Sequence, residues 1–110
     1  MGKLELTPDL LELVAERFKA LAEPARLRIL ASLRAGERTV GELGPSTGLN
    51  QANLSKHLRT LHEAGFVKRR REGLHVHYRL ADEDVFSLCD IMCGRLEREH
   101  AGQGRVIRRG

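Results

Sequence analysis

The sequence predicts a mostly α domain of the α+β class, in which a single β-hairpin interrupts a series of helices. Three observations lead to this prediction. Apolar residues recur with helical spacing up to about residue 64, alternate with polar residues over 66–80, and return to helical spacing over 81–100. A chain of 110 residues suffices for one hydrophobic core, so residues 1–100 are expected to form one domain. The basic, Gly-rich residues 101–110 are expected to form a disordered tail.

Prolines mark the starts of the first two helices. Thr7 and Pro8 have the residue types of an N-cap and a first helical residue, and they predict a helix that runs to about Ala22. Pro24 opens a second helix, "PARLRILASLRAG", which Gly36 ends.

A capping box predicts the third helix. Thr39 and Glu42, in "TVGE", are spaced so that each side chain can bond to the other's backbone N–H. Pro45 follows within the same segment, and it is expected to end this helix early or to kink it.

A fourth helix follows after a short turn. Gly48 marks the turn, and Asn50 is a favourable N-cap for a helix through about Ala64. The side chains expected to face the core of the domain are Leu54, Leu58 and Leu61.

The hairpin and the last helix complete the order of elements. The segment "FVKRRREGLHVHYRL" contains two alternating runs around Glu72 and Gly73, which is typical of a β-hairpin. Acidic residues at 82–84 then favour the start of a helix that runs to about His100. The predicted order is helix-helix-helix-turn-helix-β-hairpin-helix.

The charge is concentrated in the middle of the chain. The net charge is +4, and residues 67–81 alone carry five basic residues and one acidic residue. Residues 82–100 carry two basic and six acidic residues. A cationic segment beside an acidic one indicates a surface for nucleic acid, although a solvated basic surface would give the same composition.

The third and fourth helices, joined by a short Gly turn, have the pattern of a helix-turn-helix. The fourth helix presents polar and small side chains away from its leucines, and these suit base edges and phosphates in a major groove: Gln51, Ala52, Ser55, Lys56 and Arg59. The hairpin that follows is then a wing, whose cations suit phosphates or a narrow minor groove: Lys68, Arg69, Arg70, Arg71 and Arg79. The sequence therefore predicts a winged helix-turn-helix that binds double-stranded DNA.

These motifs resemble those of the ArsR/SmtB-type winged-helix repressors. The resemblance lies in "LAEPARLRIL" (21–30), "TVGELGPSTGLNQANLSKHLRTLHEAGFVKRRREG" (39–73) and "VHYRL" (76–80). It implies a homodimer built from the first and last helices, with paired recognition helices on an inverted-repeat operator. It also implies repression that is relieved by an inducer, which in this family is often a metal ion, an arsenic species or a redox signal.

The sequence departs from the family at the known sensor positions. Where a well-known thiol sensor of the family has Cys-x-Cys, this chain has Thr39, Val40 and Gly41. The last helix lacks the Asp-x-His pattern of the zinc-sensing members. The inducer therefore cannot be transferred from the family.

Two cysteines on the last helix are the candidate sensor. Cys89 and Cys93 are one helical turn apart on the apolar face, and His100 falls on the same stripe. In a dimer, four thiolates would meet, and thiolates favour Zn, Cd, Cu(I) or As(III). Reduced cysteine is also among the residue types most often buried in a protein core. Inducer sensing and simple packing therefore both stay open.

Apolar residues on the terminal helices exceed what one small domain needs for its own core. They predict a dimer interface made of Leu10, Leu11, Val14 and Phe18 on the first helix and Phe86, Met92 and Leu96 on the last.

The leading functional hypothesis is a homodimeric repressor released from its operator by an inducer. The alternatives are a constitutive DNA-organising protein with structural cysteines and, less consistent with the arginines, a winged helix that contacts proteins. No triad, paired carboxylates or phosphate loop has a plausible setting, so an enzyme is not expected. The chain lacks an apolar run of membrane-spanning length, and its N-terminus lacks a signal-peptide pattern, so a cytoplasmic location is expected.

Overall fold

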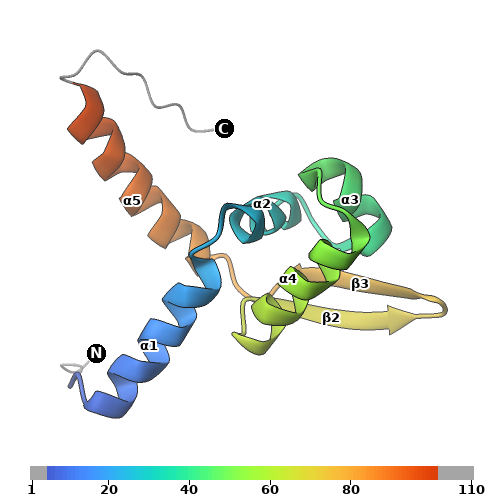
Figure 1. Cartoon of the computed structure of the whole chain (residues 1–110), viewed down its shortest axis with the longest axis horizontal. Helices are drawn as coiled ribbons and strands as arrows, with labels where there is room; N and C mark the ends of the chain where they lie inside the picture. Colours follow the sequence, from blue (N-terminus) through green and yellow to red (C-terminus); the bar gives the residue numbers. More distant parts are fainter. Residues whose placement is uncertain (1–4, 102–110) are drawn as a thin grey trace.

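The computed structural model describes residues 5–101, which form five helices and a three-stranded sheet (Figure 1). In chain order the elements are α1 (Pro8–Leu21), α2 (Pro24–Leu33), β1 (Arg38–Thr39), α3 (Val40–Thr47), α4 (Gln51–Glu63), β2 (Val67–Glu72), β3 (His75–Leu80) and α5 (Asp84–Ala101). The predicted order of helices and hairpin is confirmed. The tail predicted for 101–110 lies outside the described residues except for Ala101, which is the last residue of α5. None of the helices between residues 5 and 101 combines the length and the apolar character needed to cross a membrane.

The helix starts follow from the capping residues. The Thr7 hydroxyl accepts a hydrogen bond from the N–H of Leu10 at 3.2 Å, and the Asn50 side chain accepts one from Asn53 at 2.9 Å. Each bond satisfies a backbone N–H that the first turn of a helix leaves without an intrahelical partner. These caps fix the first residues of α1 and α4 where the sequence predicts them.

Helix α3 does not end at Pro45 but continues to Thr47. Pro45 is the sixth of its eight residues, so the ring removes only the bond that its N–H would donate to the carbonyl of Gly41. The Thr47 hydroxyl donates to the carbonyl of Leu43 at 2.6 Å and reinforces the last turn. Gly48 then ends the helix in the left-handed conformation, with φ of 74°.

The sheet contains one strand that the sequence does not predict. The strand order is β1-β3-β2, and both pairings are antiparallel. The additional strand β1 is two residues long, with Arg38 opposite Tyr78 and Thr39 opposite His77. Strand β3 is therefore central, and β2 pairs with its other edge to form the hairpin, which we call the wing (residues 67–80).

The core lies between α2, α3, α4 and the sheet. We call these three helices, with the part of the sheet that packs on them, the body. The predicted leucines of α4 are buried, with Leu58 fully excluded from solvent. The other buried apolar residues are Ile29, Leu30 and Leu33 of α2, Leu43 of α3, Val67 and Tyr78 of the sheet, and Val85 and Phe86 of α5.

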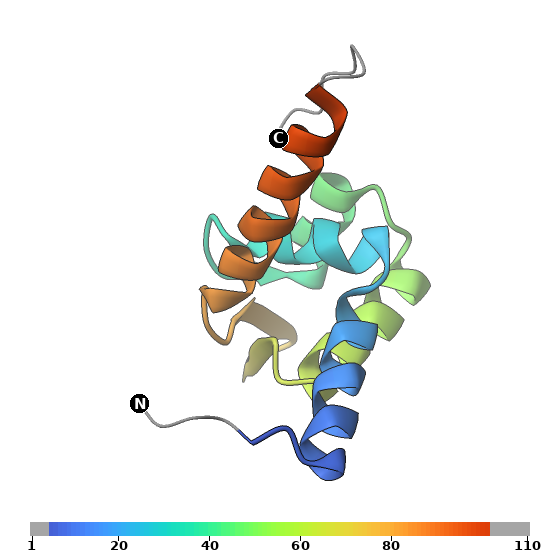
Figure 2. The same ribbon diagram turned by 90° about the vertical axis from the view of Figure 1, so that its left-hand side faces the viewer.

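Helices α1 and α5 extend from the body on the side opposite the wing, and we call them the arms (Figures 1 and 2). In α1 only Ala20 is buried, and in α5 only Val85 and Phe86 are buried. Phe86 differs from the prediction that it belongs to an exposed dimer surface. Its ring packs in the core of its own subunit, with the guanidinium carbon of Arg34 4.5 Å from the ring centroid.

Candidate nucleic-acid interface

The outer face of α4 carries the predicted base-contacting residues. All five side chains are exposed: Gln51, Ala52, Ser55, Lys56 and Arg59. Gln51 is the first residue of the helix, where recognition helices place the residues that contact base edges. The face opposite to them is held by Leu54, Leu58 and Leu61 in the core, which fixes the outward direction of the polar side chains.

Helix α3 and the turn at Gly48 position α4. Leu43 of α3 is fully buried against the same core as Leu54, and Thr47 is buried at the end of α3. The Thr47 hydroxyl also accepts a bond from the N–H of Leu49 at 3.3 Å, which braces the turn. The two helices and the turn between them therefore form the predicted helix-turn-helix.

The register of the wing separates its basic residues onto two faces. Arg69 lies opposite Tyr78 and Arg71 opposite Val76, so these two arginines share the face of the sheet that carries core residues. Both arginines are exposed, and neither forms an ion pair with any residue between 5 and 101. They are therefore available to phosphates.

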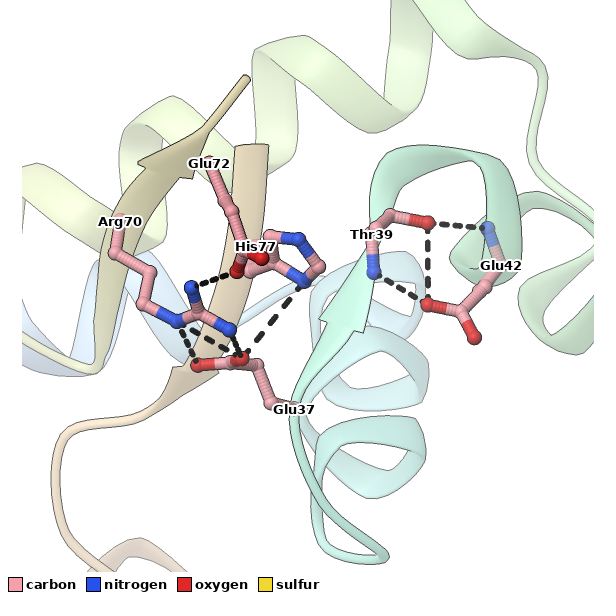
Figure 3. A network of polar contacts seen from close by, with 6 residues as sticks. All are labelled: Glu37, Thr39, Glu42, Arg70, Glu72 and His77. Carbon is pink, nitrogen blue, oxygen red and sulfur yellow. Dashed lines mark hydrogen bonds and ion pairs between the residues drawn. The ribbon is translucent and has the colours of Figure 1, made fainter. Parts of the chain in front are cut away.

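The opposite face of the wing holds Arg70 between two carboxylates (Figure 3). Its Nε lies 3.0 and 3.1 Å from the two carboxylate oxygens of Glu37, and its Nη2 lies 2.6 Å from Oε1 of the same residue. Its Nη1 donates to Glu72 on the same strand. These hydrogen bonds lower the pKa of both carboxyls and raise the pKa of the guanidinium.

Sequence reasoning did not identify Glu37. It precedes β1 and lies 33 positions before Arg70 in the sequence. His77 of β3 adds to the group, with its Nδ1 3.7 Å from Glu37 Oε1. No local pattern could have indicated this group, because β1 has only two residues and gives no periodicity.

The two cysteines are free and half-buried in α5. Burial raises the pKa of the Cys89 thiol, and the neighbouring Cys93 and Asp90 add to this effect. Among residues 5–101 no group of three His, Cys, Asp or Glu side chains is placed to hold a metal ion. His100, near the end of α5, is half-buried.

Six of the seven predicted dimer residues are exposed or half-buried on the arms. Leu11, Val14, Phe18 and Met92 are exposed, and Leu10 and Leu96 are half-buried. Three further large apolar side chains on the arms are also exposed, namely Leu13, Leu88 and Ile91, and the sequence prediction did not include them. The arms thus expose more apolar surface than the helical wheel indicates.

Known proteins resemble this chain in sequence and in architecture. Residues 23–69 match the family described as bacterial regulatory protein, arsR family. The HTH-type transcriptional regulator Rv0324 of Mycobacterium tuberculosis is 42% identical over 87 residues, which are 79% of this chain, and the match spans 38% of the length of Rv0324. The biofilm growth-associated repressor of Agrobacterium fabrum is 42% identical over 79 residues, which cover 72% of this chain and 68% of that protein.

A solved structure matches almost the whole chain. It is the solution NMR structure of the homodimeric winged helix-turn-helix DNA-binding domain (fragment 1–100) of Mb0332 from Mycobacterium bovis. Its TM-score is 0.74 at 36% sequence identity, over 98% of this chain and 99% of that one. The predicted fold and the predicted family are confirmed: the chain is a winged helix-turn-helix that belongs to the ArsR family of bacterial transcription regulators, which are DNA-binding proteins and not enzymes.

Proposed function

We propose that this protein is a homodimeric transcriptional repressor that binds an inverted-repeat operator in the cytoplasm and leaves it when an inducer binds. The observation that carries the proposal is the division of the molecule into two sides. Most of the exposed large apolar side chains lie on the arms, the exceptions being Leu6, Leu27 of α2 and Leu74 at the turn of the wing. The cationic wing projects from the opposite side of the body (Figure 1).

The exposed apolar side chains of the arms support the dimer. Phe18 is 55% exposed and Ile91 is 72% exposed, and burying such side chains against a second copy is favourable at about 25 cal/mol per Å² of apolar area. A two-fold axis between the arms would place the two copies of α4 on the same face of a DNA duplex, which matches an inverted repeat. The homodimeric state of the Mb0332 domain agrees with this arrangement.

Relatives that act as repressors support repression as the mode of regulation. The Agrobacterium protein described above is named a biofilm growth-associated repressor. The described residues form one DNA-binding unit and its arms, and such a unit represses most simply by occupying a DNA site that transcription needs.

We further propose that Cys89 and Cys93, with the same pair from the partner, form the inducer site. One subunit offers two thiols on one helical face, so four thiolates would assemble only across the dimer. Such a donor set suits Zn, Cd, Cu(I) or As(III). To release the operator, the inducer must bind the DNA-free geometry more tightly than the DNA-bound one.

A second candidate function is constitutive DNA binding with cysteines that only pack. The observation that favours it is the raised pKa of Cys89, because a thiol that stays protonated is a weaker nucleophile and a weaker metal ligand. Under this hypothesis neither ions nor oxidants change the affinity for DNA.

The test of repression begins with selection of bound sequences from fragmented genomic DNA. We expect an inverted repeat bound by two chains per duplex, and micromolar protein that sediments as a dimer. A protein that stays monomeric at that concentration, or selected sites without two-fold symmetry, would contradict the proposal.

The test of sensing uses the selected duplex and two double variants, C89S/C93S and C89A/C93A. If the thiols sense, both variants keep the dimer and the DNA affinity of the unchanged protein but no longer respond to a panel of Zn, Cd, Cu(I), arsenite and peroxide. If the thiols only pack, C89S/C93S loses more stability than C89A/C93A, because serine places a polar hydroxyl in each half-buried thiol position. Release by the panel that persists in both variants would end the thiol hypothesis.

A further inference from the structure

We infer that Glu37 is a positioning residue for DNA binding. It holds Arg70 away from the phosphates and ties the wing to the start of α3, so that Arg69 and Arg71, rather than Arg70, are the arginines of β2 that meet DNA. This inference rests on the proposed DNA-binding role of the wing.

Three of the five guanidinium N–H groups of Arg70 donate to carboxylates within the chain. All three guanidinium nitrogens donate to carboxylate oxygens: Nε and Nη2 to Glu37, and Nη1 to Glu72. Two parallel bonds from one guanidinium to one carboxylate form the strong, directional type of ion pair. The Glu37 side chain is 27% exposed and the Arg70 side chain is 49% exposed, so the pair lies at the surface and its geometry, more than burial, distinguishes it from an ordinary surface pair.

The charge of the group argues against a phosphate contact. One arginine faces two carboxylates, so Arg70, Glu37 and Glu72 together carry a net charge of −1 near neutral pH when His77 is neutral. A phosphate beside Arg70 would also stand beside these two carboxylates, whose negative charge would repel it unless Arg70 left them unpaired. Arg69 and Arg71 carry no such cost, because they lie on the other face of the wing without an ion-pair partner between residues 5 and 101.

The position of Glu37 explains why the pair also fixes the wing. Glu37 is two residues before Thr39, whose hydroxyl accepts from the N–H of Glu42 at 3.2 Å and caps α3. The Glu42 carboxylate in turn accepts from the N–H of Thr39 at 2.9 Å. Figure 3 shows the two groups on either side of β1, so the wing and the first turn of α3 are joined through a short, hydrogen-bonded segment.

This arrangement makes a prediction that depends on salt. Each phosphate that a protein neutralises contributes about 0.9 to the slope of log affinity against log salt concentration. If Arg70 makes no phosphate contact, replacing it leaves the slope unchanged. If Glu37 and Glu72 keep Arg70 from the phosphates, removing both carboxylates adds one phosphate contact and steepens the slope.

The experiment measures anisotropy of a fluorescein-labelled 30-base-pair duplex of mixed sequence between 50 and 200 mM NaCl. We expect R71Q to make the slope shallower by about 0.9, R70Q to leave it unchanged, and E37Q/E72Q to make it steeper by about 0.9. E12Q, which removes one carboxylate from α1, and D9N/E12Q, which removes two as E37Q/E72Q does, control for net charge and are expected to leave the slope unchanged. R70Q/E37Q/E72Q should return the slope to that of the unchanged protein.

A second measurement tests the positioning role without DNA. Hydrogen exchange of the amides of β1 and of residues 68–72 should be faster in E37Q than in the unchanged protein or in E12Q, because the wing loses its bidentate anchor. A slope for R70Q as shallow as that for R71Q would overturn the inference, since Arg70 would then bind a phosphate. Unchanged exchange in E37Q would overturn the anchoring role. Failure of the unchanged protein to bind the duplex would instead contradict the proposed DNA-binding function itself.

Discussion

The body and the arms use apolar residues with the same helical spacing and reach opposite outcomes. In α4 the stripe of Leu54, Leu58 and Leu61 is almost completely buried. In α1 the corresponding stripe leaves Leu11 and Phe18 about half exposed. The difference teaches that periodicity identifies the face of a helix that needs a partner, whereas the fold decides whether that partner lies in the same chain or in a second copy.

The largest expected effect tests the buried side of this comparison. Leu58→Ala should cost about 2–5 kcal/mol in the free energy of unfolding, because a fully buried leucine leaves a cavity when it is truncated. Leu74→Ala, at a position of the wing that is 97% exposed, should change the same quantity by no more than about 0.5 kcal/mol. Urea denaturation at one fixed protein concentration measures both. Equal losses would show that burial in the core does not decide the contribution of these leucines to stability.

Dimer formation tests the exposed apolar residues of the arms. Phe18→Ala should weaken the dimer by on the order of 2 kcal/mol, or roughly 30-fold in dissociation constant, because aromatic residues contribute much of the energy of an interface. Sedimentation equilibrium measures the change, and Glu12→Ala on the same helix serves as the control. A dissociation constant that Phe18→Ala leaves unaltered would remove α1 from the interface.

Helix α4 and the wing should differ in which part of the DNA they contact. Gln51→Ala should cost about 1–3 kcal/mol on the selected operator and little on mixed-sequence DNA, because a base contact is lost. Arg71→Ala should weaken binding to both duplexes to a similar extent, because phosphates carry no sequence information. Parallel titrations of the two duplexes measure this difference. Similar losses for Gln51→Ala on both would assign it to the DNA backbone.

The smallest effect concerns the capping box that joins the wing to α3. Thr39→Ala should destabilise the protein by about 1 kcal/mol at pH 7, because the helix loses its N-cap hydroxyl. Thermal unfolding followed by circular dichroism measures this change. An unchanged melting temperature would mean that the strand pairing of β1 alone fixes the start of α3.

The contribution of Glu42 should depend on pH. Hydrogen bonds from the backbone and side chain of Thr39 lower the pKa of Glu42 from its ordinary value of 4.5. The folded protein therefore holds the proton less tightly than the unfolded chain, so this stabilisation is present above pH 4.5 and is lost as the pH falls through the lowered pKa. The stability difference between the unchanged protein and Glu42→Gln should shrink over that range. A difference that stays constant down to pH 3 would contradict this linkage.

Local signals explain which parts of the molecule could be predicted from sequence. The caps at Thr7, Thr39 and Asn50 act within three residues, and the sequence places them correctly. The wing follows from alternation around a Gly turn, and Gly73 indeed has a φ of 61°. In each case the residues that form the bond or the turn are neighbours in the chain.

Contacts between distant segments explain what the sequence could not show. Strand β1 exists only because β3 offers a free edge, and Glu37 reaches Arg70 only because β1 pairs there. A helical wheel places Phe86 on the predicted interface, but the first turn of α5 rests on the body and buries it. The exposure of Ile91 has the same origin, because the rest of α5 leaves the body.

The attachment of α5 also bears on how a dimer would measure the distance between half-sites. The helix has 18 residues, which makes it about 27 Å long. Only its first turn, at Val85 and Phe86, is buried against the body. In a dimer joined through the arms, a tilt of about 10° at that turn would displace the distant end by roughly 5 Å over this length. That exceeds the base-pair rise of about 3.4 Å. The packing of Phe86 beneath Arg34, which fixes the angle between α5 and the body, would therefore set the distance between the two copies of α4 in such a dimer.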